Sequence, residues 1–345
     1  MSVSTDKLLE TLRCPGCHGV LRLNDERARD GGDLCLECAT CKQDFPVIGG
    51  IPRLLLSPLR EALLGNETAV GNDNQQVKTA LSFGFEWTRF PEMYEEWNQS
   101  FLGYMQPHDA EFFRGKKVLD AGCGNGRFAY YAAKYGAEVW AIDLGPAVEV
   151  ARRNTEQAGR VQVLQADLHR PPFASESFDF IYSIGVLHHL PDPEGAFQNL
   201  LRYLKPEGQI QIYLYWKPER QPIKRALLAM VNLARKITTR LQHRTVYALA
   251  YPAAVAAFVL FVWPYRLMKQ VPGLESIAER IPMKQYARFP FRVCVNDQLD
   301  RFSAPIENRY TRKEVEDWLR RGNLEGAQVS PNYGWVATGL KPSID

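Results

Sequence analysis

An acidic residue followed by three alternating glycines has the composition of a ligand-binding turn. Gly122, Gly124 and Gly126 follow Asp120, which ends an apolar run and precedes a helical pattern. Glycines reach backbone angles that other residues avoid and let the chain approach a bound molecule closely, while the next helix offers free N–H groups. The spacing departs from the G-x-G-x-x-G dinucleotide fingerprint, and the Gly-Lys-Ser/Thr of a phosphate loop is absent. The acid at the strand end suits a ligand with a cationic amino group, as in an amino-acid moiety.

Two further acids end segments with the pattern of strands. Residues 138–143 end on Asp143, whose carboxylate could accept hydrogen bonds from both hydroxyls of a ribose, and residues 161–168 contain Asp167 at their end. A fourth strand is expected at 178–184. Beyond it we expect a helix at 197–204, a turn at 205–208 and a strand at 209–215. Near the end of the sequence, Thr311 and Glu314 form a capping box that opens a helix ending at Gly322. Two further strands are expected at 327–330 and 335–340.

Between Lys116 and Trp216 this ordered set resembles the class I S-adenosylmethionine-dependent methyltransferases, and residues 186–192 resemble a loop of type 11 methyltransferase domains. The resemblance implies an α/β fold with a Rossmann-like, doubly wound seven-stranded sheet whose last strand is antiparallel. It also implies S-adenosyl-L-methionine as cofactor, with Asp167 contacting the adenine amino group. The expected cofactor-binding residues are Asp120, Gly122, Cys123, Gly124, Gly126, Asp143, Leu144, Asp167, Leu168, Ser183 and Ile184.

His188 and His189 follow the fourth strand, at the end where open α/β sheets bind ligands. An imidazole has the right unperturbed pKa to act as a base, so we predict that one of the two is catalytic and favour His189. The alternative is that one histidine bonds to its own loop while the other faces solvent. No Asn/Asp-Pro-Pro-Tyr/Phe motif follows this strand, which favours O- or C-methylation over methylation of an adenine or glutamine nitrogen.

Four cysteines near the start have the spacing of a structural zinc site. Cys14 and Cys17 form one C-x-x-C knuckle, Cys38 and Cys41 form another, and Gly31-Gly32 between them predicts a hairpin. A closed set of four thiolates leaves no open position for catalysis. The pattern resembles the small zinc-ribbon protein that partners tRNA and release-factor methyltransferases, which leaves Cys35 as a bystander. A thioredoxin-like redox pair is the alternative, but no βαβ pattern surrounds either knuckle.

Residues 54–71 read as a helical and then polar linker, and residues 66–76 as flexible. An aromatic run from Phe83 to Tyr104 follows. In the family such residues often form a cap over cofactor and acceptor, with Arg89 and Tyr94 as possible contacts. The alternative is a helix that packs its apolar face on the sheet.

Residues 217–302 are the part least typical of the family. The stretch 217–244 reads as a basic amphipathic helix, and 245–265 carries no charge but contains Pro252 and Pro264, which should break it. A membrane-spanning helix, a peripheral membrane-docking insertion, and a soluble helical lid or oligomer interface all remain open. A polar loop is expected at 296–305. Asp297, Asp300, Arg301 and Arg309 could orient a polar acceptor or could be structural.

Composition limits the partners and compartment. A net charge of +3 over 345 residues makes a nucleic-acid partner unlikely, and residues 1–11 lack the apolar core of a signal peptide. Paired C-x-x-C knuckles fit a reducing cytoplasm, so we expect a cytoplasmic protein. The expected partner is a small-molecule acceptor, and peripheral contact with the inner face of the membrane through 220–265 and homo-oligomers are open options. A lipid, lipid-linked or glycan or natural-product intermediate is one class of acceptor that the sequence allows. An RNA methyltransferase and a cofactor-binding scaffold or activator subunit are the alternatives.

The expected domains follow from these segments. They are a zinc ribbon at 1–57, a linker and aromatic helical cap at 58–112, the cofactor-binding core at 113–216, the helical insertion at 217–302 and the C-terminal part of the core at 303–345.

Overall fold

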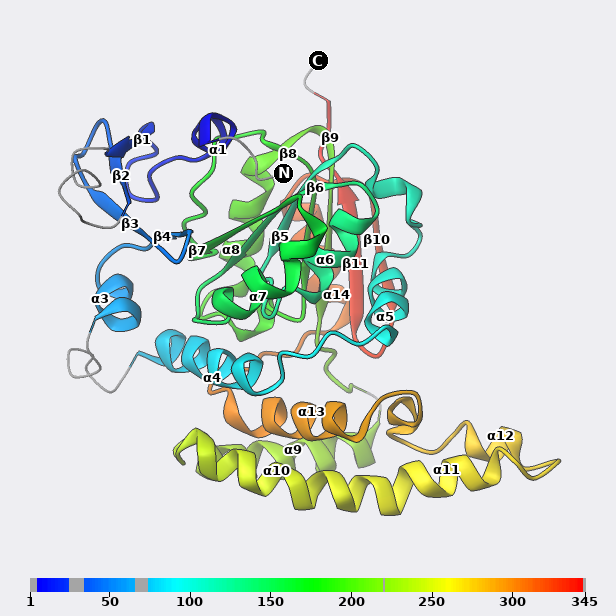
Figure 1. Ribbon diagram of the computed structural model, residues 1–345. Coiled ribbons are helices and arrows are strands. Elements are labelled where there is room, and N and C mark those ends of the chain that lie inside the picture. The colour runs from blue at the N-terminus through cyan, green and yellow to red at the C-terminus, as the bar shows by residue number, and fades with distance from the viewer. Residues whose placement is uncertain (1–4, 25–33, 66–73, 220, 344–345) are drawn as a thin grey trace. The chain divides into compact units, whose positions relative to one another are not determined.

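The computed structural model describes residues 5–24, 34–65, 74–219 and 221–343. They form two compact units, Met1–Arg220 with Ile306–Asp345, and Gln221–Pro305. The strands are β1 (Leu21–Asn24), β2 (Cys35–Cys38), β3 (Asp44–Ile48), β4 (Ile51–Leu54), β5 (Lys117–Ala121), β6 (Glu138–Asp143), β7 (Val161–Ala166), β8 (Phe178–Ile184), β9 (Leu204–Leu214), β10 (Glu325–Pro331) and β11 (Trp335–Leu340), as labelled in Figure 1.

The helices of the first unit that bear on the argument are α1 (Thr5–Thr11), α3 (Leu59–Leu64), α4 (Gln75–Arg89), α5 (Glu96–Met105), α6 (Arg127–Lys134), α7 (Val148–Thr155), α8 (Pro193–Leu200) and α14 (Arg312–Arg321). The capping box of Thr311 and Glu314 that opens α14 is present, and Gly322 ends this helix, as predicted. Residues 201–203, which were expected to continue α8, form a separate 3-10 turn.

The sheet order β7-β6-β5-β8-β9-β11-β10 confirms the predicted doubly wound α/β fold. The strands β7, β6, β5, β8 and β9 pair in parallel, whereas β11 is antiparallel to both β9 and β10. The expected turn at 205–208 is instead a bulge inside β9: Phe178 pairs with Leu204, but Phe180 pairs with Gln209. Glu207 reaches a φ of 59° within this bulge, so the backbone turns locally without leaving the strand.

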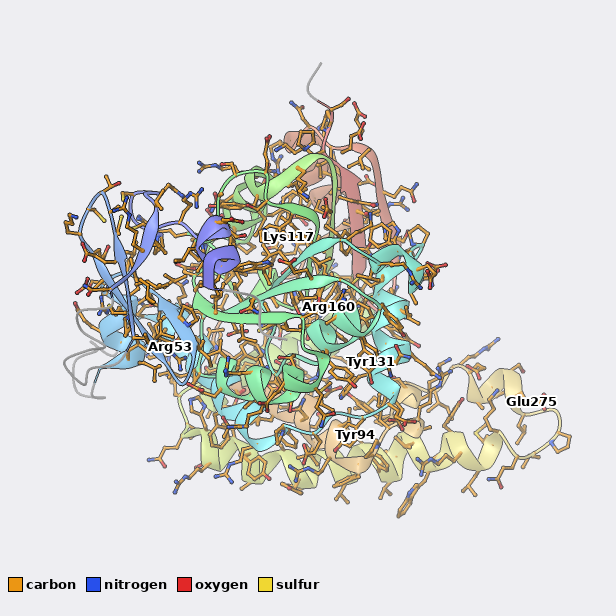
Figure 2. All side chains as sticks on the ribbon, turned by 45° about the horizontal axis from the view of Figure 1, so that its top comes forward. Arg53, Tyr94, Lys117, Tyr131, Arg160 and Glu275 are labelled. Carbon is orange, nitrogen blue, oxygen red and sulfur yellow. The ribbon has the colours of Figure 1, made fainter. Side chains whose placement is uncertain are left out.

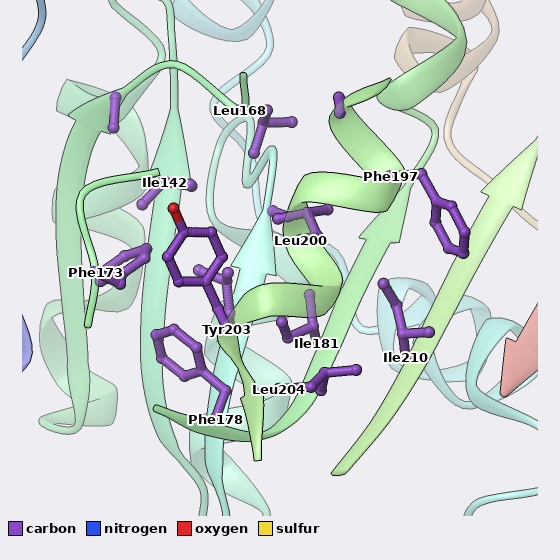
Figure 3. Packing of buried hydrophobic residues seen from close by; sticks show 14 of the residues in the cluster. Ile142, Leu168, Phe173, Phe178, Ile181, Phe197, Leu200, Tyr203, Leu204 and Ile210 are labelled. Carbon is purple, nitrogen blue, oxygen red and sulfur yellow. The ribbon is translucent and has the colours of Figure 1, made fainter. Parts of the chain in front are cut away.

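Alternate residues of the central strands supply the two faces of the sheet. Val118 and Val139 belong to a buried cluster that also contains residues of α5, α6 and α7. Leu119 and Trp140 belong to the opposite cluster, which contains residues of α8 and α14 and is shown in part in Figure 3. Helices on both faces explain why these strands are apolar throughout, because neither face meets water.

The cysteine-containing segment is joined to the main sheet as part of the same unit. A Gly49-Gly50 turn, with φ of 59° and 74°, reverses β3 into β4, and β4 then pairs in parallel with β7 through Arg53–Gln165 and Leu54–Ala166. The sheet thereby gains strands beyond the seven predicted, in the order β1-β2-β3-β4-β7. The predicted hairpin at Gly31-Gly32 lies outside the described residues.

The second unit is helical. It contains α9 (Pro222–Thr238), α10 (His243–Ala257), the π-helix η5 (Phe258–Val262), α11 (Trp263–Met268), α12 (Glu275–Ala278), the 3-10 helix η6 (Lys284–Ala287) and α13 (Phe291–Ser303). Both α9 and α10 pack against α13 (Figure 1). Its bounds, 221–305, start and end slightly later than the predicted 217–302, because Lys217 still bonds to Tyr310 of the first unit.

Two expectations for this unit were wrong. One continuous helix runs from His243 to Met268, and Pro252 lies inside it. The π-helix Phe258–Val262 comes just before Pro264, and its wider turn accommodates that proline without ending the helix. Residues 296–303 are the second half of α13 rather than a polar loop, because Val295 and Leu299 are buried four residues apart and bring the polar residues between them into the helix. Among the described residues, one helix, His243–Met268, is long and apolar enough to cross a membrane.

Candidate functional site

Three carboxylates lie in sequence along one edge of the sheet. The strand registers place Asp120 opposite Ala141, two residues before Asp143, and place Asp143 opposite Gln165, two residues before Asp167. Because β5, β6 and β7 are parallel neighbours, all three acids lie at their carboxyl ends, where open α/β sheets bind ligands. The predicted set therefore forms one continuous acidic edge.

The glycine turn packs tightly against this edge. Gly122, Gly124 and Gly126 all have positive φ, and a Cβ on Gly122 would lie 2.4 Å from Val186 Cγ1. Asp143 holds the turn from the neighbouring strand, since its two carboxylate oxygens accept the N–H groups of Gly124 at 3.0 Å and Gly145 at 2.9 Å. Each oxygen retains a second lone pair, so the same carboxylate can still accept bonds from a diol.

Asp120 is 2% exposed and accepts a hydrogen bond of 3.0 Å from the Tyr182 hydroxyl. Burial raises the pKa of Asp120 to about 7, against the opposing effect of the Tyr182 bond. Burial also raises the pKa of Asp143. A cationic ligand at this position would restore the charged form of Asp120, which fits the expected amino group of the cofactor.

Helix α4 covers the acidic edge with one face. Gln76, Ala80, Phe83, Gly84 and Trp87 recur at helical spacing, and each contacts a different part of the site. The Gln76 amide bonds to Asp167 at 3.1 Å, and the Phe83 ring lies 4.8 Å from the His189 ring. Cβ atoms on three glycines would lie 2.3 to 2.9 Å from atoms across this contact: Gly84 from Pro146, Gly145 from Ala80 and Gly124 from Trp87. The first part of the aromatic run thus belongs to a helix that contacts the segments after β5, β6 and β7, where the cofactor is expected.

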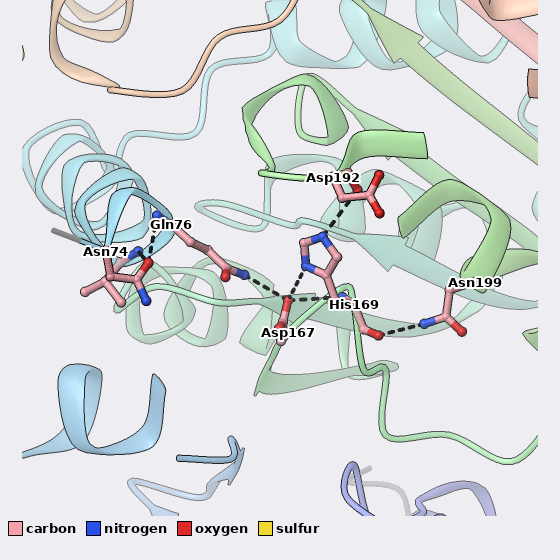
Figure 4. A network of polar contacts seen from close by, with 7 residues as sticks. Asn74, Gln76, Asp167, His169, Asp192 and Asn199 are labelled. Carbon is pink, nitrogen blue, oxygen red and sulfur yellow. Dashed lines mark hydrogen bonds and ion pairs between the residues drawn. The ribbon is translucent and has the colours of Figure 1, made fainter. Parts of the chain in front are cut away.

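Asp167 is the centre of a polar network shown in Figure 4. Its Oδ1 atom accepts bonds from Gln76, from the His169 N–H at 3.0 Å and from His169 Nδ1 at 3.0 Å. His169 Nε2 lies 3.2 Å from the Asp192 carbonyl oxygen, so both ring nitrogens face acceptors. The bond to Asp167 raises the pKa of His169. Gln76 and His169, neither of which was predicted, orient the carboxylate expected to contact adenine.

The two predicted catalytic histidines lie in a loop that residues after the helical insertion hold in place. His189 Nδ1 lies 2.6 Å from the Ile306 carbonyl oxygen. Asn308 donates its backbone N–H to the His188 carbonyl at 2.8 Å and its side-chain amide to the Leu190 carbonyl at 3.3 Å. Because a carbonyl only accepts, His189 Nδ1 carries a proton, and in the neutral ring the lone pair is on Nε2.

His188 has a different environment. Its ring is fully buried and stacks on Tyr215 at 3.9 Å, and neither ring nitrogen has a hydrogen-bond partner among the described residues. Burial lowers the pKa of His188 well below its usual value, so the ring is neutral. Contrary to the alternative expected from the sequence, neither histidine faces solvent.

The remaining predicted cofactor residues lie around the same edge in supporting positions. Ser183 is buried and donates its hydroxyl to the Ala121 carbonyl at 2.7 Å, which braces β8 against β5. The Leu144 carbonyl accepts a bond of 2.8 Å from Gln165. Cys123 and Leu168 are buried, and Ile184 is half-buried.

Arg127, and the predicted cap contacts Arg89 and Tyr94, lie among aromatic side chains. The Arg127 guanidinium, at the start of α6, lies 4.7 Å from the Trp87 ring centre and 4.4 Å from that of Trp97. Tyr94 accepts a bond of 3.1 Å at its carbonyl from the Tyr131 hydroxyl (Figure 2), and Arg89 lies 5.4 Å from the Phe85 ring centre. Sequence reasoning missed Arg127, although its position directly after the glycine turn could have suggested it.

The four residues predicted to orient an acceptor are divided between the two units. Asp297, Asp300 and Arg301 belong to α13 in the second unit, where Asp297 accepts a bond of 2.6 Å from Tyr286. Arg309 belongs to the first unit, pairs with Glu307 at 2.7 Å and lies 5.1 Å from the Tyr215 ring centre.

The four predicted cysteines come together as a possible metal site. The Sγ atoms of Cys14, Cys17, Cys38 and Cys41 all lie within 4.8 Å of one another, with Cys14 to Cys41 at 3.7 Å and Cys17 to Cys38 at 3.4 Å. A tetrahedral zinc with bonds of about 2.3 Å separates its sulfurs by about 3.8 Å, so the arrangement fits that ion. Cys35 lies outside this set.

Comparison with known proteins agrees with this geometry. Residues 119–212 match the family described as a methyltransferase domain. A ubiquinone biosynthesis O-methyltransferase of Idiomarina loihiensis is 35% identical over 113 residues, which cover 32% of this chain and 46% of that protein. The protein of the same name from Xanthomonas euvesicatoria pv. vesicatoria is 32% identical over 154 residues, covering 40% and 64%. The chain therefore spans about half the length of the curated relatives it matches.

A solved structure, human N-acetylserotonin methyltransferase in complex with SAM, aligns with a TM-score of 0.46 and 11% identity over 79% of this chain and 61% of that one.

Proposed function

We propose that this chain, whose residues 119–212 form a methyltransferase domain, transfers a methyl group from S-adenosyl-L-methionine to an oxygen of a small, apolar acceptor. The order of Asp120, Asp143 and Asp167 along three parallel strands carries the proposal. These acids match the amino group, the ribose diol and the adenine amino group of one elongated cofactor. The name of the relatives, an O-methyltransferase, supports oxygen as the acceptor atom.

The cofactor supplies a methyl group on a cationic sulfur that leaves as a neutral thioether. The chain has to align the acceptor, exclude water and take the proton of the hydroxyl. We assign the proton to Nε2 of His189, because the Ile306 carbonyl fixes the proton on Nδ1 and the Asn308 bonds hold the loop. With donor and acceptor bound, Nε2 of His189 would take the hydroxyl proton, while the cofactor would supply the methyl group and keep the carbon–sulfur electron pair as a neutral thioether.

We further propose that the four-cysteine cluster holds one zinc ion with a structural role. The sulfur spacing supports zinc, and a closed four-thiolate set leaves no coordination position for an acceptor. The segment would then resemble the zinc ribbons of methyltransferase activators while acting within its own chain.

A transfer assay tests the function. The protein is incubated with methyl-labelled S-adenosyl-L-methionine and matched series of alkyl-substituted phenols, catechols and anilines. We expect methylated phenol or catechol, and a loss of about 100-fold or more in kcat for His189→Ala with unchanged affinity for S-adenosylhomocysteine. Methylation of the anilines alone, or full activity of the His189 variant, would refute the assignment.

A further inference from the structure

We propose that the helical unit Gln221–Pro305 carries a docking surface for an anionic lipid bilayer, formed by the exposed apolar faces of α9 and of the helix His243–Met268. The surface is independent of the methyl-transfer chemistry. It is argued from burial within the unit, from the charge that surrounds the apolar side chains, and from the path of the chain.

Helix α9 has two opposite faces. Arg235 is buried and donates to the carbonyls of Arg301 at 2.6 Å and Ala304 at 2.7 Å, and Thr238 donates to Phe302 at 2.7 Å, so this face covers the end of α13. Met230 and Ile237, nearly two turns apart, lie on the other side of the helix. They are 68% and 65% exposed, and Leu227 and Leu233 beside them are exposed as well. The face of α9 directed away from α13 is therefore apolar.

The long helix repeats this arrangement. Val246, Ala250 and Ala254 are buried at four-residue spacing on the side that packs against α13. Large apolar side chains also lie exposed on this helix, with Leu260 63% and Trp263 55% exposed. A soluble surface helix usually has a polar outer face, so these exposed apolar side chains indicate an apolar partner for the outer face.

Charge selects a negatively charged partner. From Gln221 to Leu274 the sequence contains eight Lys and Arg residues and no Asp or Glu. The unit 221–305 carries 13 basic and four acidic residues, a net charge of +9, whereas the whole chain carries only +3. Lys224 and Lys236 on α9, and Arg240 just beyond its end, are exposed and border this apolar segment. An apolar face bordered by basic residues is the pattern of helices that lie in an anionic membrane interface.

The path of the chain favours lying on the bilayer over crossing it. The unit leaves the sheet after Trp216 and returns at Tyr310, and these two residues form a parallel bridge. Both ends of the insertion therefore start from one point, whereas a single span would leave them on opposite sides of the membrane. His243–Met268 is the one span candidate among the described residues, and its buried face is already used by α13.

Vesicle co-sedimentation of the full chain tests the proposal, with phosphatidylglycerol–phosphatidylcholine vesicles compared with phosphatidylcholine alone. We expect binding to the anionic vesicles that weakens as salt rises, and a blue shift of the fluorescence contributed by Trp263, obtained by difference from Trp263→Phe. Met230→Asp with Leu260→Asp should weaken binding at least tenfold. Tyr333→Asp, which places one such negative charge at an exposed aromatic position of the first unit, should bind like the parent.

Lys236→Gln with Arg240→Gln should also weaken binding to the anionic vesicles, whereas Lys313→Gln on α14 should not. Melting temperature and calorimetric binding of S-adenosylhomocysteine are measured on every variant, so that a folding defect or a failure of the proposed cofactor site is seen separately. Equal sedimentation of the Met230/Leu260 variant and the Tyr333 variant would overturn the proposal. So would a parent dimer that ignores vesicles and becomes monomeric in the Met230/Leu260 variant, since the surface would then belong to a second copy.

Discussion

Arg53, on the last strand of the cysteine-containing segment, donates a hydrogen bond of 3.1 Å to the side chain of Gln165 on β7. Gln165 in turn donates at 2.8 Å to the carbonyl of Leu144, the residue directly after Asp143. Arg53 also pairs with Glu149 of α7 and is only 3% exposed (Figure 2). Two hydrogen bonds thus connect the cysteine segment to the loop expected to hold the ribose.

Replacing Arg53 should therefore affect cofactor binding as well as stability. Arg53→Met leaves the oxygen of Gln165 buried without its donor, and we expect a loss of about 2 kcal/mol in the free energy of unfolding. We also expect several-fold weaker binding of S-adenosylhomocysteine by calorimetry. The matched control is Arg60→Met, because Arg60 donates to the Asp44 carbonyl within the same segment. Equal cofactor affinity in the two variants would limit Arg53 to a role in stability.

The raised pKa of Asp120 should make cofactor binding depend on pH. Since only the carboxylate can pair with the cofactor's amino group, affinity for S-adenosylhomocysteine should rise between pH 5.5 and 8, with a midpoint near the Asp120 pKa of about 7. Asp120→Asn should remove this slope and weaken binding roughly tenfold or more at pH 8. Tyr182→Phe should move the midpoint to higher pH, because the Tyr182 bond lowers this pKa. Calorimetric titration at several pH values measures all three effects.

The contribution of Asp120 to folding stability should fall as pH rises, whereas cofactor affinity should increase. The pKa of Asp120 rises from 3.8 to about 7 on folding, so between these values the folded protein holds a proton that the unfolded chain releases. Raising the pH through this window therefore lowers the free energy of unfolding contributed by Asp120. Urea denaturation at pH 5 and pH 8 should show a smaller difference for Asp120→Asn than for the parent. An equal difference would contradict the assignment of this proton to Asp120.

The contact of α4 with the cofactor loops can be tested with a pair of glycines. Gly84 and Gly103 both lie within helices, but a Cβ on Gly84 would lie 2.3 Å from Pro146, whereas a Cβ on Gly103 meets nothing within 4 Å. Gly103→Ala should stabilise the protein by about 0.5–1 kcal/mol through helix propensity alone. Gly84→Ala should displace α4, lower the melting temperature and weaken S-adenosylhomocysteine binding. Similar behaviour of the two variants would argue against close packing of α4 on this loop.

The cysteine cluster makes a clear prediction about metal content. We expect the purified protein to contain one zinc per chain, and Cys14→Ser to lose the metal and lower the melting temperature. Cys35→Ser changes a buried cysteine of the same segment that lies outside the cluster, and should keep its zinc. Elemental analysis of the two variants provides the measurement. Retention of zinc in Cys14→Ser together with its loss in Cys35→Ser would reverse the assignment of ligands.

The elements that the sequence identified correctly are those with local signals. Apolar runs ending in Asp120, Asp143 and Asp167 specify both the strand and the side of the sheet at which each acid lies. The Thr311 capping box was equally local. The resemblance to a known family then supplied the doubly wound sheet with an antiparallel last strand, which periodicity alone does not contain.

Other features depend on contacts between distant segments and left no local signal. The pairing of β4 with β7 joins residues 112 positions apart, at Arg53 and Gln165. The hydrogen bond that His189 Nδ1 donates to the Ile306 carbonyl likewise joins residues 117 positions apart. The helical spacing of the residues on one face of α4 was visible in the sequence. The prediction used only its aromatic residues, so it did not include Gln76 and Gly84 on the same face. The prediction that Pro252 breaks the helix was wrong, because packing of the helix compensates for the backbone hydrogen bond that a proline cannot donate.

Trp216 and Tyr310 form a parallel bridge, and Lys217 N donates to the Tyr310 carbonyl at 2.8 Å. The helical insertion therefore leaves and rejoins the sheet at neighbouring residues, as an exchangeable module would. Its two attachment points are adjacent, so neither its length nor its internal fold constrains the sheet from which it emerges. Evolution could therefore alter, enlarge or replace residues 221–305 while the three acids stayed in place, and redesign could do the same. The membrane contact and the acceptor proposed above can thus change without altering the site proposed for the methyl donor.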